Sequence, residues 1–149
     1  MAYDRFDWHY GSDDYPSDLP SENGGTHIGI FLAWAIINNL EGEELQEDSK
    51  ESLDAVRQMS MTGREFLIKE CDEKFWDIDL NDEGNDFAKH YYETNDYIDD
   101  YSNILDNNLP SLYHVKDNWD NYNKMSVVIS ERYNKWKIKQ NKNWWEFWK

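Results

Sequence analysis

The chain has 149 residues, of which 39% are hydrophobic and 16% aromatic, and its 31 acidic and 15 basic side chains give a net charge of −16. This length fits one domain, and the rings argue against disorder, because each can bury on the order of 150 to 250 Å². A strongly negative potential repels phosphate backbones and anionic lipid, so we expect no nucleic-acid partner and no membrane partner.

The charge is distributed unevenly along the chain. Residues 1–115 contain 27 acids and 7 bases, a net charge of −20, whereas residues 116–149 have a net charge of +4. The first residues lack the pattern of a signal peptide, and the apolar run 28–37 is too short to span a membrane. The single cysteine, Cys71, is expected to be a small buried hydrophobe, because acidic neighbours oppose a reactive thiolate. We therefore expect a cytoplasmic protein.

Residues 1–25 are rich in Asp, Ser, Pro and Gly and predict an irregular arm, whose aromatic rings should hold it across the domain. Thr26 is predicted to cap a helix over residues 27–40. That helix is apolar on nearly every side, which places it in the middle of the domain. His27, in its first turn, is predicted to form a hydrogen bond with the arm.

Leu45, Leu53, Val56 and Met59 have the spacing of one amphipathic surface helix over residues 43–59, and its acidic run is expected to be a solvated face. A capping-box pattern follows, with Thr62 at the N-cap and a glutamate three residues later. This pattern predicts that a further short helix begins there.

The second half of the chain alternates between extended and helical patterns. Residues 74–80 predict a short strand or an extended turn, and residues 83–93 and 96–105 predict two helices. Residues 119–136 have the strongest helical spacing and predict one long helix, followed by a basic, Trp-rich tail over residues 137–149, whose rings are expected to dock on the domain. The pattern as a whole predicts a single all-α or mainly α domain over residues 1–149, with five to six helices and at most a minor strand or hairpin element.

Few motifs point to chemistry. Asp77, Asp79 and Asn81 match the first, third and fifth ligands of a calcium loop, but Asp82 stands where that loop needs Gly and Ala88 where it needs Glu. We therefore expect a polar turn. The four histidines lack the paired spacing of metal ligands, and no phosphate-binding or nucleophile motif is visible. The sequence predicts no catalytic residue, no metal and no cofactor, and hence a protein that is not an enzyme.

Five stretches of the chain resemble a known family: Tyr15–Pro20, Thr26–Ile36, Thr62–Phe66, Asp79–Ala88 and Tyr97–Tyr101. Together they are similar to small, uncharacterised bacterial proteins, many of which look like immunity proteins paired with polymorphic toxins. The resemblance covers most of the chain and leaves out the tail. Its motifs belong to helix packing and turns, so it implies a domain and a kind of partner and assigns no site residue.

We expect from these observations an immunity protein that binds and occludes a cognate, basic toxin in the cytoplasm, without turnover. Carboxylates beside aromatic rings suit such an interface. The candidate partner-binding residues are Asp77, Asp79, Asp96, Tyr97, Asp99 and Asp100. Two alternatives stay open, a hydrolase that reverses a toxin's modification and an acidic regulatory adaptor with another basic partner. The sequence does not indicate an oligomeric state.

Overall fold

The computed structural model describes the backbone of residues 1–147 and the side chains of residues 1–142. In this part of the chain the fold is mainly α, with eight helices, six of them of seven residues or more, and one two-stranded antiparallel sheet. The predicted fold class is confirmed. The helices are α1 (Phe6–Tyr10), α2 (Thr26–Ile37), α3 (Glu43–Asp48), α4 (Lys50–Arg57), α5 (Gly63–Glu70), α6 (Asp82–Tyr91), α7 (Asp96–Leu105) and α8 (Trp119–Phe147). The strands are β1 (Ala2–Arg5) and β2 (Lys74–Trp76).

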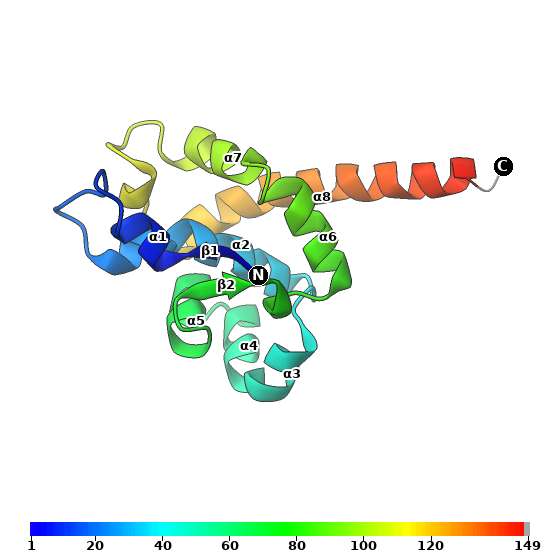
Figure 1. The fold of residues 1–149 in the computed structure, drawn as a ribbon, viewed down its shortest axis with the longest axis horizontal. Helices are drawn as coiled ribbons and strands as arrows, with labels where there is room; N and C mark the ends of the chain where they lie inside the picture. Colours follow the sequence, from blue (N-terminus) through cyan, green and yellow to red (C-terminus); the bar gives the residue numbers. More distant parts are fainter. Residues whose placement is uncertain (148–149) are drawn as a thin grey trace.

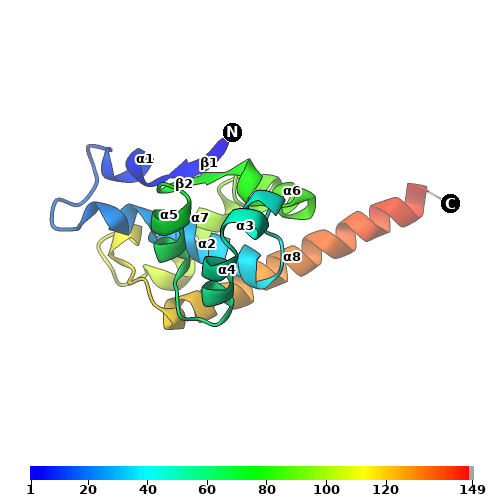
Figure 2. The same ribbon diagram turned by 90° about the horizontal axis from the view of Figure 1, so that it is seen from below.

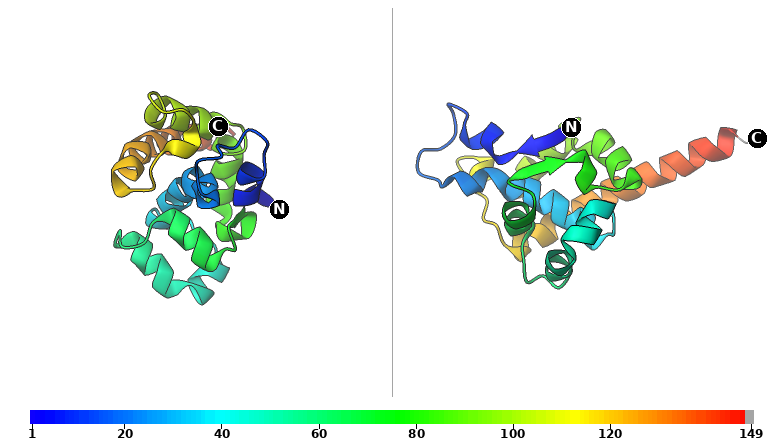
Figure 3. Two further views of the ribbon diagram at one scale, coloured as in Figure 1. Left: turned by 90° about the vertical axis from the view of Figure 1, so that its left-hand side faces the viewer. Right: turned by 60° about the horizontal axis from the view of Figure 1, so that its bottom comes forward.

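Helix α2 is the centre of the molecule, as its apolar sequence predicts. Every residue from Thr26 to Ile36 is buried, because the other elements surround the helix. Seen from the end of the molecule, α7 and α8 lie on one side of α2 and α3, α4 and α5 on the other (Figure 3). The indole of Trp34 donates to Ser130 of α8 over 2.9 Å, which ties the central helix to the longest one.

The start of α2 differs from the prediction in one detail. The N-cap position is occupied by Gly25, and Thr26 is the first helical residue. The Thr26 hydroxyl accepts a hydrogen bond from Arg64 of α5 over 3.1 Å. This side chain therefore joins two helices, where a capping role would have joined it to its own backbone.

The predicted irregular arm contains regular structure. Ala2–Arg5 form β1, which pairs antiparallel with β2 so that Ala2 lies opposite Trp76 and Arg5 opposite Lys74. Phe6, at the start of α1, is fully buried, so the arm does lie across the domain. Figures 1 and 2 show β1 and β2 side by side along one face of the helices. The prediction was wrong about this segment because the strand forms only with a partner about seventy residues further along the chain.

The predicted helix over residues 43–59 is divided into α3 and α4 at Ser49. The Ser49 side chain is buried, and its hydroxyl donates to Glu70 of α5 over 3.2 Å. Ser52 donates to the same carboxylate over 2.8 Å. The division of the predicted helix at Ser49 therefore coincides with hydrogen bonds to α5. The spacing of apolar residues in the sequence does not indicate this division. The capping box at Thr62 is confirmed, because the Thr62 hydroxyl accepts from the backbone of Glu65 and the Glu65 side chain accepts from the backbone of Thr62.

Helix α8 continues as far as Phe147, through most of the segment that the sequence separates as a tail. Four of the described side chains of this helix are buried: Tyr122, Met125, Ile129 and Trp136. Beyond them the helix extends away from the body of the molecule (Figure 1). The expectation that the last rings dock on the domain concerns Trp144, Trp145, Phe147 and Trp148, which lie outside the described side chains. Among the described residues, no helix combines the length and apolarity needed to cross a membrane.

Candidate functional site

An open groove lies between α3, the turn that follows β2, and the start of α6. Its volume is about 860 Å³. Five carboxylates line it, and the residues that line it include no lysine or arginine: the five are Glu43, Glu44, Glu47, Asp77 and Asp82. We call this surface the acidic groove. Its position brings the acidic run of residues 43–47 next to the acidic turn at residues 77–82.

Backbone hydrogen bonds hold the two sides of the acidic groove together. The Gly42 N–H donates to the Asp79 carbonyl over 3.0 Å, and the Asn81 N–H donates to the Leu40 carbonyl over 2.8 Å. Asn81 is also the N-cap of α6, where its side chain accepts from the Gly84 N–H over 2.8 Å. Because α3 and α6 both begin beside the groove, their acidic first turns are stabilised by the positive ends of the helix dipoles.

The acidic groove carries more negative charge than its surroundings neutralise. Asp77 pairs with the amino group of Met1 over 3.2 Å. Among the described side chains, the other four carboxylates of the groove form no ion pair. Ile78 lies among them and is 55% exposed. An apolar side chain surrounded by unpaired carboxylates suits a partner that presents both cations and apolar contacts.

The six candidate residues from the sequence occupy different environments. Asp77 lines the acidic groove. Asp79 is buried and accepts a hydrogen bond from the Trp76 N–H over 2.8 Å. Burial raises the pKa of Asp79 to about 6, and the nearby charges of Glu44 and Asp77 act in the same direction. Asp79 therefore stabilises the turn through its bond to the Trp76 backbone. Its buried side chain is not accessible to a partner in this structure.

The other four candidates belong to α7 and do not line the groove. Tyr97 is fully buried, and its hydroxyl donates to the His27 carbonyl. Asp100 accepts two hydrogen bonds from Arg132 of α8, over 2.9 and 3.0 Å, and one from Tyr91. Asp96 is partly exposed and Asp99 is exposed. The structure thus makes Tyr97 and Asp100 part of the packing and leaves Asp96 and Asp99 accessible.

Two other sequence features have structural roles. The residues that resemble a calcium loop do not converge, because Asp79 caps the Trp76 backbone and Asn81 caps α6. The expected polar turn is confirmed. Cys71 packs against the core, and burial raises the pKa of its thiol well above the usual range. Its thiolate is therefore disfavoured at neutral pH.

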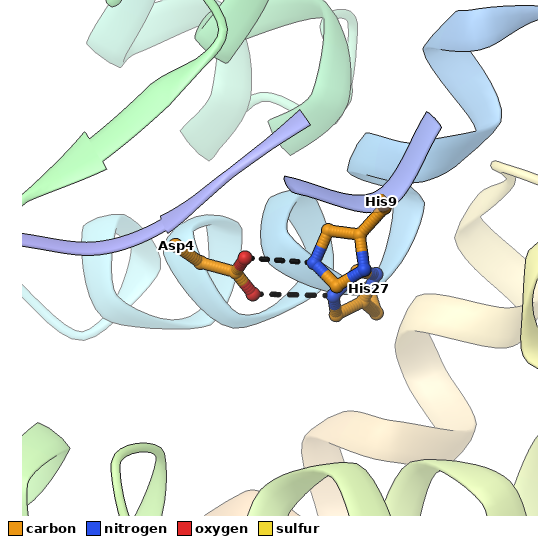
Figure 4. Close-up of side chains that lie close together, drawn as sticks. All are labelled: Asp4, His9 and His27. Carbon is orange, nitrogen blue, oxygen red and sulfur yellow. Dashed lines mark hydrogen bonds and ion pairs between the residues drawn. The ribbon is translucent and has the colours of Figure 1, made fainter. Parts of the chain in front are cut away.

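A second constellation lies where the arm meets α2. Asp4 of β1, His9 of α1 and His27 of α2 point toward one another (Figure 4). His9 Nε2 is 2.7 Å from one carboxylate oxygen of Asp4, and His27 Nε2 is 3.2 Å from the other. The two imidazole rings are nearly perpendicular, with their centroids 4.5 Å apart. We call these residues the Asp–His–His cluster. The predicted hydrogen bond between His27 and the arm is confirmed.

Hydrogen bonds keep Asp4 ionised although it is buried. Burial alone raises the pKa of this carboxyl, but the bonds from His27 and His9 outweigh it and hold the pKa well below its usual range. Burial lowers the pKa of His27. Tyr92 donates to Asp4 over 2.6 Å, and burial raises the pKa of its hydroxyl. At neutral pH the cluster therefore holds one carboxylate and a neutral His27.

Apart from the bond between His27 and the arm, the sequence did not indicate this cluster, because each of its residues comes from a different element. His9 and His27 are separated by a turn-rich stretch, and no regular spacing relates them. The many aromatic residues of the arm were the only available signal that it packs on the domain. The three residues of the cluster line a cavity of about 200 Å³, and the other residues that line it include Tyr3, Glu93 and Asn95. Among the described residues, this is the only group of three His, Cys, Asp or Glu side chains close enough to share a metal ion.

Comparison with known proteins gives one match. A family model with the description "Domain of unknown function (DUF7832)" matches residues 2–115. No curated protein and no solved structure matches the chain. The matched range runs from β1 to the segment after α7 and contains both the acidic groove and the Asp–His–His cluster. Helix α8 follows it.

Proposed function

The chain belongs to the DUF7832 family, whose description names no activity, and from its acidic groove we propose that it acts by binding a basic partner protein. The observation that carries this proposal is the set of four unpaired carboxylates around the exposed Ile78. The described residues that line this groove include no lysine or arginine. A lysine- or arginine-rich segment supplies the missing charges, and an apolar residue next to it can pack on Ile78.

The charge of the whole chain supports the same kind of partner. A net charge of −16 attracts a basic protein over a distance set by the Debye length, about 8 to 10 Å at physiological salt. Charge complementarity of this kind mainly increases the rate of association. Exposed carboxylates on an open surface favour binding over catalysis, since a general acid or base needs a position that shifts its pKa toward the working pH.

The partner that we propose is a cognate toxin, which makes the protein an immunity protein of the producing cell. Its role is stoichiometric, because it occludes the toxin and does not turn over. The resemblance of several sequence stretches to immunity proteins supports this choice, and the acidic groove provides a surface for a basic toxin. A different basic partner remains the alternative that the experiment below distinguishes.

The experiment uses the product of the neighbouring open reading frame as the probe. We expect this product to be toxic when expressed alone and harmless when the full chain is co-expressed. The two proteins should purify as a complex at low salt, and the association rate should fall as salt is added. A harmless neighbour, or the absence of a complex at low salt, contradicts the immunity role.

A block of substitutions tests the groove itself. The groove block combines Glu43→Gln, Glu44→Gln, Glu47→Gln and Asp82→Asn. The matched control block neutralises four exposed acids outside the groove: Asp13→Asn, Glu93→Gln, Asp120→Asn and Glu131→Gln. Both blocks change the net charge equally, so any difference between them reflects the position of the carboxylates. We expect loss of protection only for the groove block, with binding at least about tenfold weaker, which corresponds to about 1.4 kcal/mol or more of binding free energy. Equal effects of the two blocks argue against the groove.

A third variant tests the accessible candidates on α7. Asp96→Asn combined with Asp99→Asn removes the two carboxylates of this helix that the fold leaves open to solvent. If the interface extends from the groove to α7, this variant weakens binding on its own, and it weakens binding further when it is combined with the groove block. If binding depends on the groove alone, the α7 variant behaves like the control block.

A further inference from the structure

We propose that Asp4, His9 and His27 form a binding site for one Zn²⁺ ion, with a fourth coordination position that opens onto the adjoining cavity. This site is separate from the acidic groove, because the residues that line the groove and those that line this cavity do not overlap. The inference therefore stands independently of the proposed partner.

The distances within the Asp–His–His cluster are close to those of a zinc site. Zinc binds histidine nitrogen at about 2.0 to 2.1 Å and carboxylate oxygen at about 2.0 to 2.2 Å in tetrahedral geometry, which places neighbouring ligand atoms roughly 3.3 Å apart. His27 Nε2 is 3.2 Å from one oxygen of the Asp4 carboxylate, and His9 Nε2 is 2.7 Å from the other oxygen. The three ligand atoms lie within 4.8 Å of one another. Binding of one ion through a single oxygen of Asp4 requires that the carboxylate turn and that His9 move outward.

The ligand types select the class of metal. Two imidazole nitrogens and one carboxylate oxygen suit zinc and related transition metals. Calcium and magnesium prefer sites made of oxygen atoms, and calcium takes six to eight of them. Three protein ligands and one open position are the usual arrangement of zinc sites that exchange a water molecule. The cavity of about 200 Å³ provides room for that water.

Residues around the cluster hold the proposed ligands in place. His9 Nδ1 is 2.7 Å from the Tyr113 hydroxyl, and a hydroxyl can donate or accept, so it supports the ring in either tautomer. Tyr92 and the Arg5 N–H donate to Asp4 over 2.6 and 2.9 Å. Outer partners of this kind orient metal ligands and tune their affinity.

His27 supplies an independent observation. It is buried, and its Nδ1 atom has no hydrogen-bond partner. A buried polar atom without a partner destabilises the fold, and an aliphatic side chain in the same position would avoid that cost. Among the described residues, the only hydrogen bond of the His27 side chain is the one that Nε2 makes inside the cluster. Coordination through Nε2 does not satisfy Nδ1, so the support for the site is that Nε2 of this buried side chain is directed at the other two proposed ligands.

Zinc titration of the full chain tests the proposal. The protein is first treated with a chelator and dialysed, and Zn²⁺ is then added at physiological salt, which weakens binding to surface carboxylates. Competition with a chromogenic chelator gives the affinity and the stoichiometry. We expect one saturable Zn²⁺ per chain, an increase in Tm on binding, and no competition from Ca²⁺ or Mg²⁺. Co²⁺ in the same site should give the strong visible absorption of four-coordinate cobalt.

Variants assign the binding to the cluster. His9→Gln keeps a donor for Asp4 but removes a ligand, and we expect its Zn²⁺ affinity to fall at least about 100-fold. Tyr113→Phe removes only the outer partner of His9 and should lower the affinity roughly 10- to 100-fold. His90→Gln is the matched control, because His90 is exposed and lies outside the cluster. Its affinity should equal that of the wild type.

Three outcomes overturn the proposal: the absence of a saturable site in the wild type, an unchanged affinity in folded His9→Gln, and an equal loss in His90→Gln. Circular dichroism and the Tm of each metal-free variant show whether it is folded. His9 lies on the short α1 and is only partly buried, so His9→Gln is expected to fold. If it does not, Tyr113→Phe decides the question, and an unchanged affinity in that variant overturns the zinc site.

Discussion

At the scale of single residues, Asp79 is a carboxylate that the fold turns inward. It accepts a hydrogen bond from the Trp76 backbone and is almost completely buried. Burial raises its pKa to about 6, whereas an aspartate in an unfolded chain has a pKa of about 3.9. The folded state therefore binds this proton more tightly than the unfolded state. Ionised Asp79 lowers the stability of the fold above pH 6, by about 2 to 3 kcal/mol, and the loss is recovered as the pH falls from about 6 toward 4.

Asp79→Asn tests this relation. The asparagine keeps an oxygen that can accept from the Trp76 N–H but carries no charge. We expect the variant to exceed the wild type in free energy of unfolding at pH 8, with the difference shrinking as the pH is lowered to 5. Urea unfolding of both proteins at several pH values measures this difference in the free energy of unfolding. Similar m values show that the substitution changes stability and not the surface exposed on unfolding. A difference that does not change with pH contradicts the burial of the charge.

The candidate residues themselves show what the sequence could and could not predict at this scale. It correctly predicted that His27 bonds to the arm, since a polar residue in an apolar helix needs a partner. It did not distinguish Asp77, at the groove, from Asp79, two residues away and buried. A short turn can direct consecutive side chains to different sides, and only the packing of neighbouring elements decides which carboxylate becomes buried.

At the scale of elements, the crossing of α2 and α5 depends on two glycines. A Cβ atom added to Gly29 would lie 2.2 Å from the backbone nitrogen of Arg64, and one added to Gly63 would lie 1.8 Å from the carbonyl oxygen of Gly29. Both obstacles are backbone atoms, which cannot rotate away. The helices can approach this closely only because neither residue has a side chain.

Gly29→Ala should therefore destabilise the protein by about 3 kcal/mol, at the upper end of the usual cost of overpacking. The sign is informative, because the same substitution inside an unconstrained helix stabilises by roughly 0.5 to 1 kcal/mol. Thermal and urea unfolding measure the effect. Gly24→Ala is the matched control, because its Cβ would meet its nearest neighbour at 3.1 Å, and a smaller loss is expected. A stabilised Gly29→Ala variant contradicts the close crossing.

Elements defined by local sequence were predicted well, and those defined by distant contacts were not. The apolar run of α2 and the capping box at Thr62 are contained in consecutive residues, so their patterns are visible in the chain. The break at Ser49 goes with its bond to Glu70, and β1 requires β2 as its partner. The Asp–His–His cluster needs three elements at once, so no pattern within a single element could predict it.

At the scale of the whole molecule, the core extends beyond the range matched by the family model. That range ends at residue 115, but α8 contributes four buried side chains to the same core: Tyr122, Met125, Ile129 and Trp136. Removal of one large core side chain costs about 2 to 5 kcal/mol, and domains have a total stability of about 5 to 15 kcal/mol. The matched range is therefore not expected to be stable without α8.

Truncation after residue 118 tests this conclusion. We expect residues 1–118 to lack a cooperative thermal transition and the near-ultraviolet circular dichroism of packed rings. Addition of α8 as a separate peptide over residues 119–149 should restore both signals in part, since the exposed face of α2 is complementary to it. A cooperative transition in the truncated chain at the wild-type Tm contradicts a structural role for α8.

The pairing of β1 with β2 has a consequence for synthesis on the ribosome. The segment that becomes β1 is translated long before its partner Lys74–Trp76, and α8, which completes the core on the other side of α2, is translated after all the other described elements. The nascent chain therefore exposes α2, its most apolar segment, until α8 has been translated. We expect chaperones to bind this exposed helix during synthesis, and codons that slow translation between α2 and α8 should lower the folded yield.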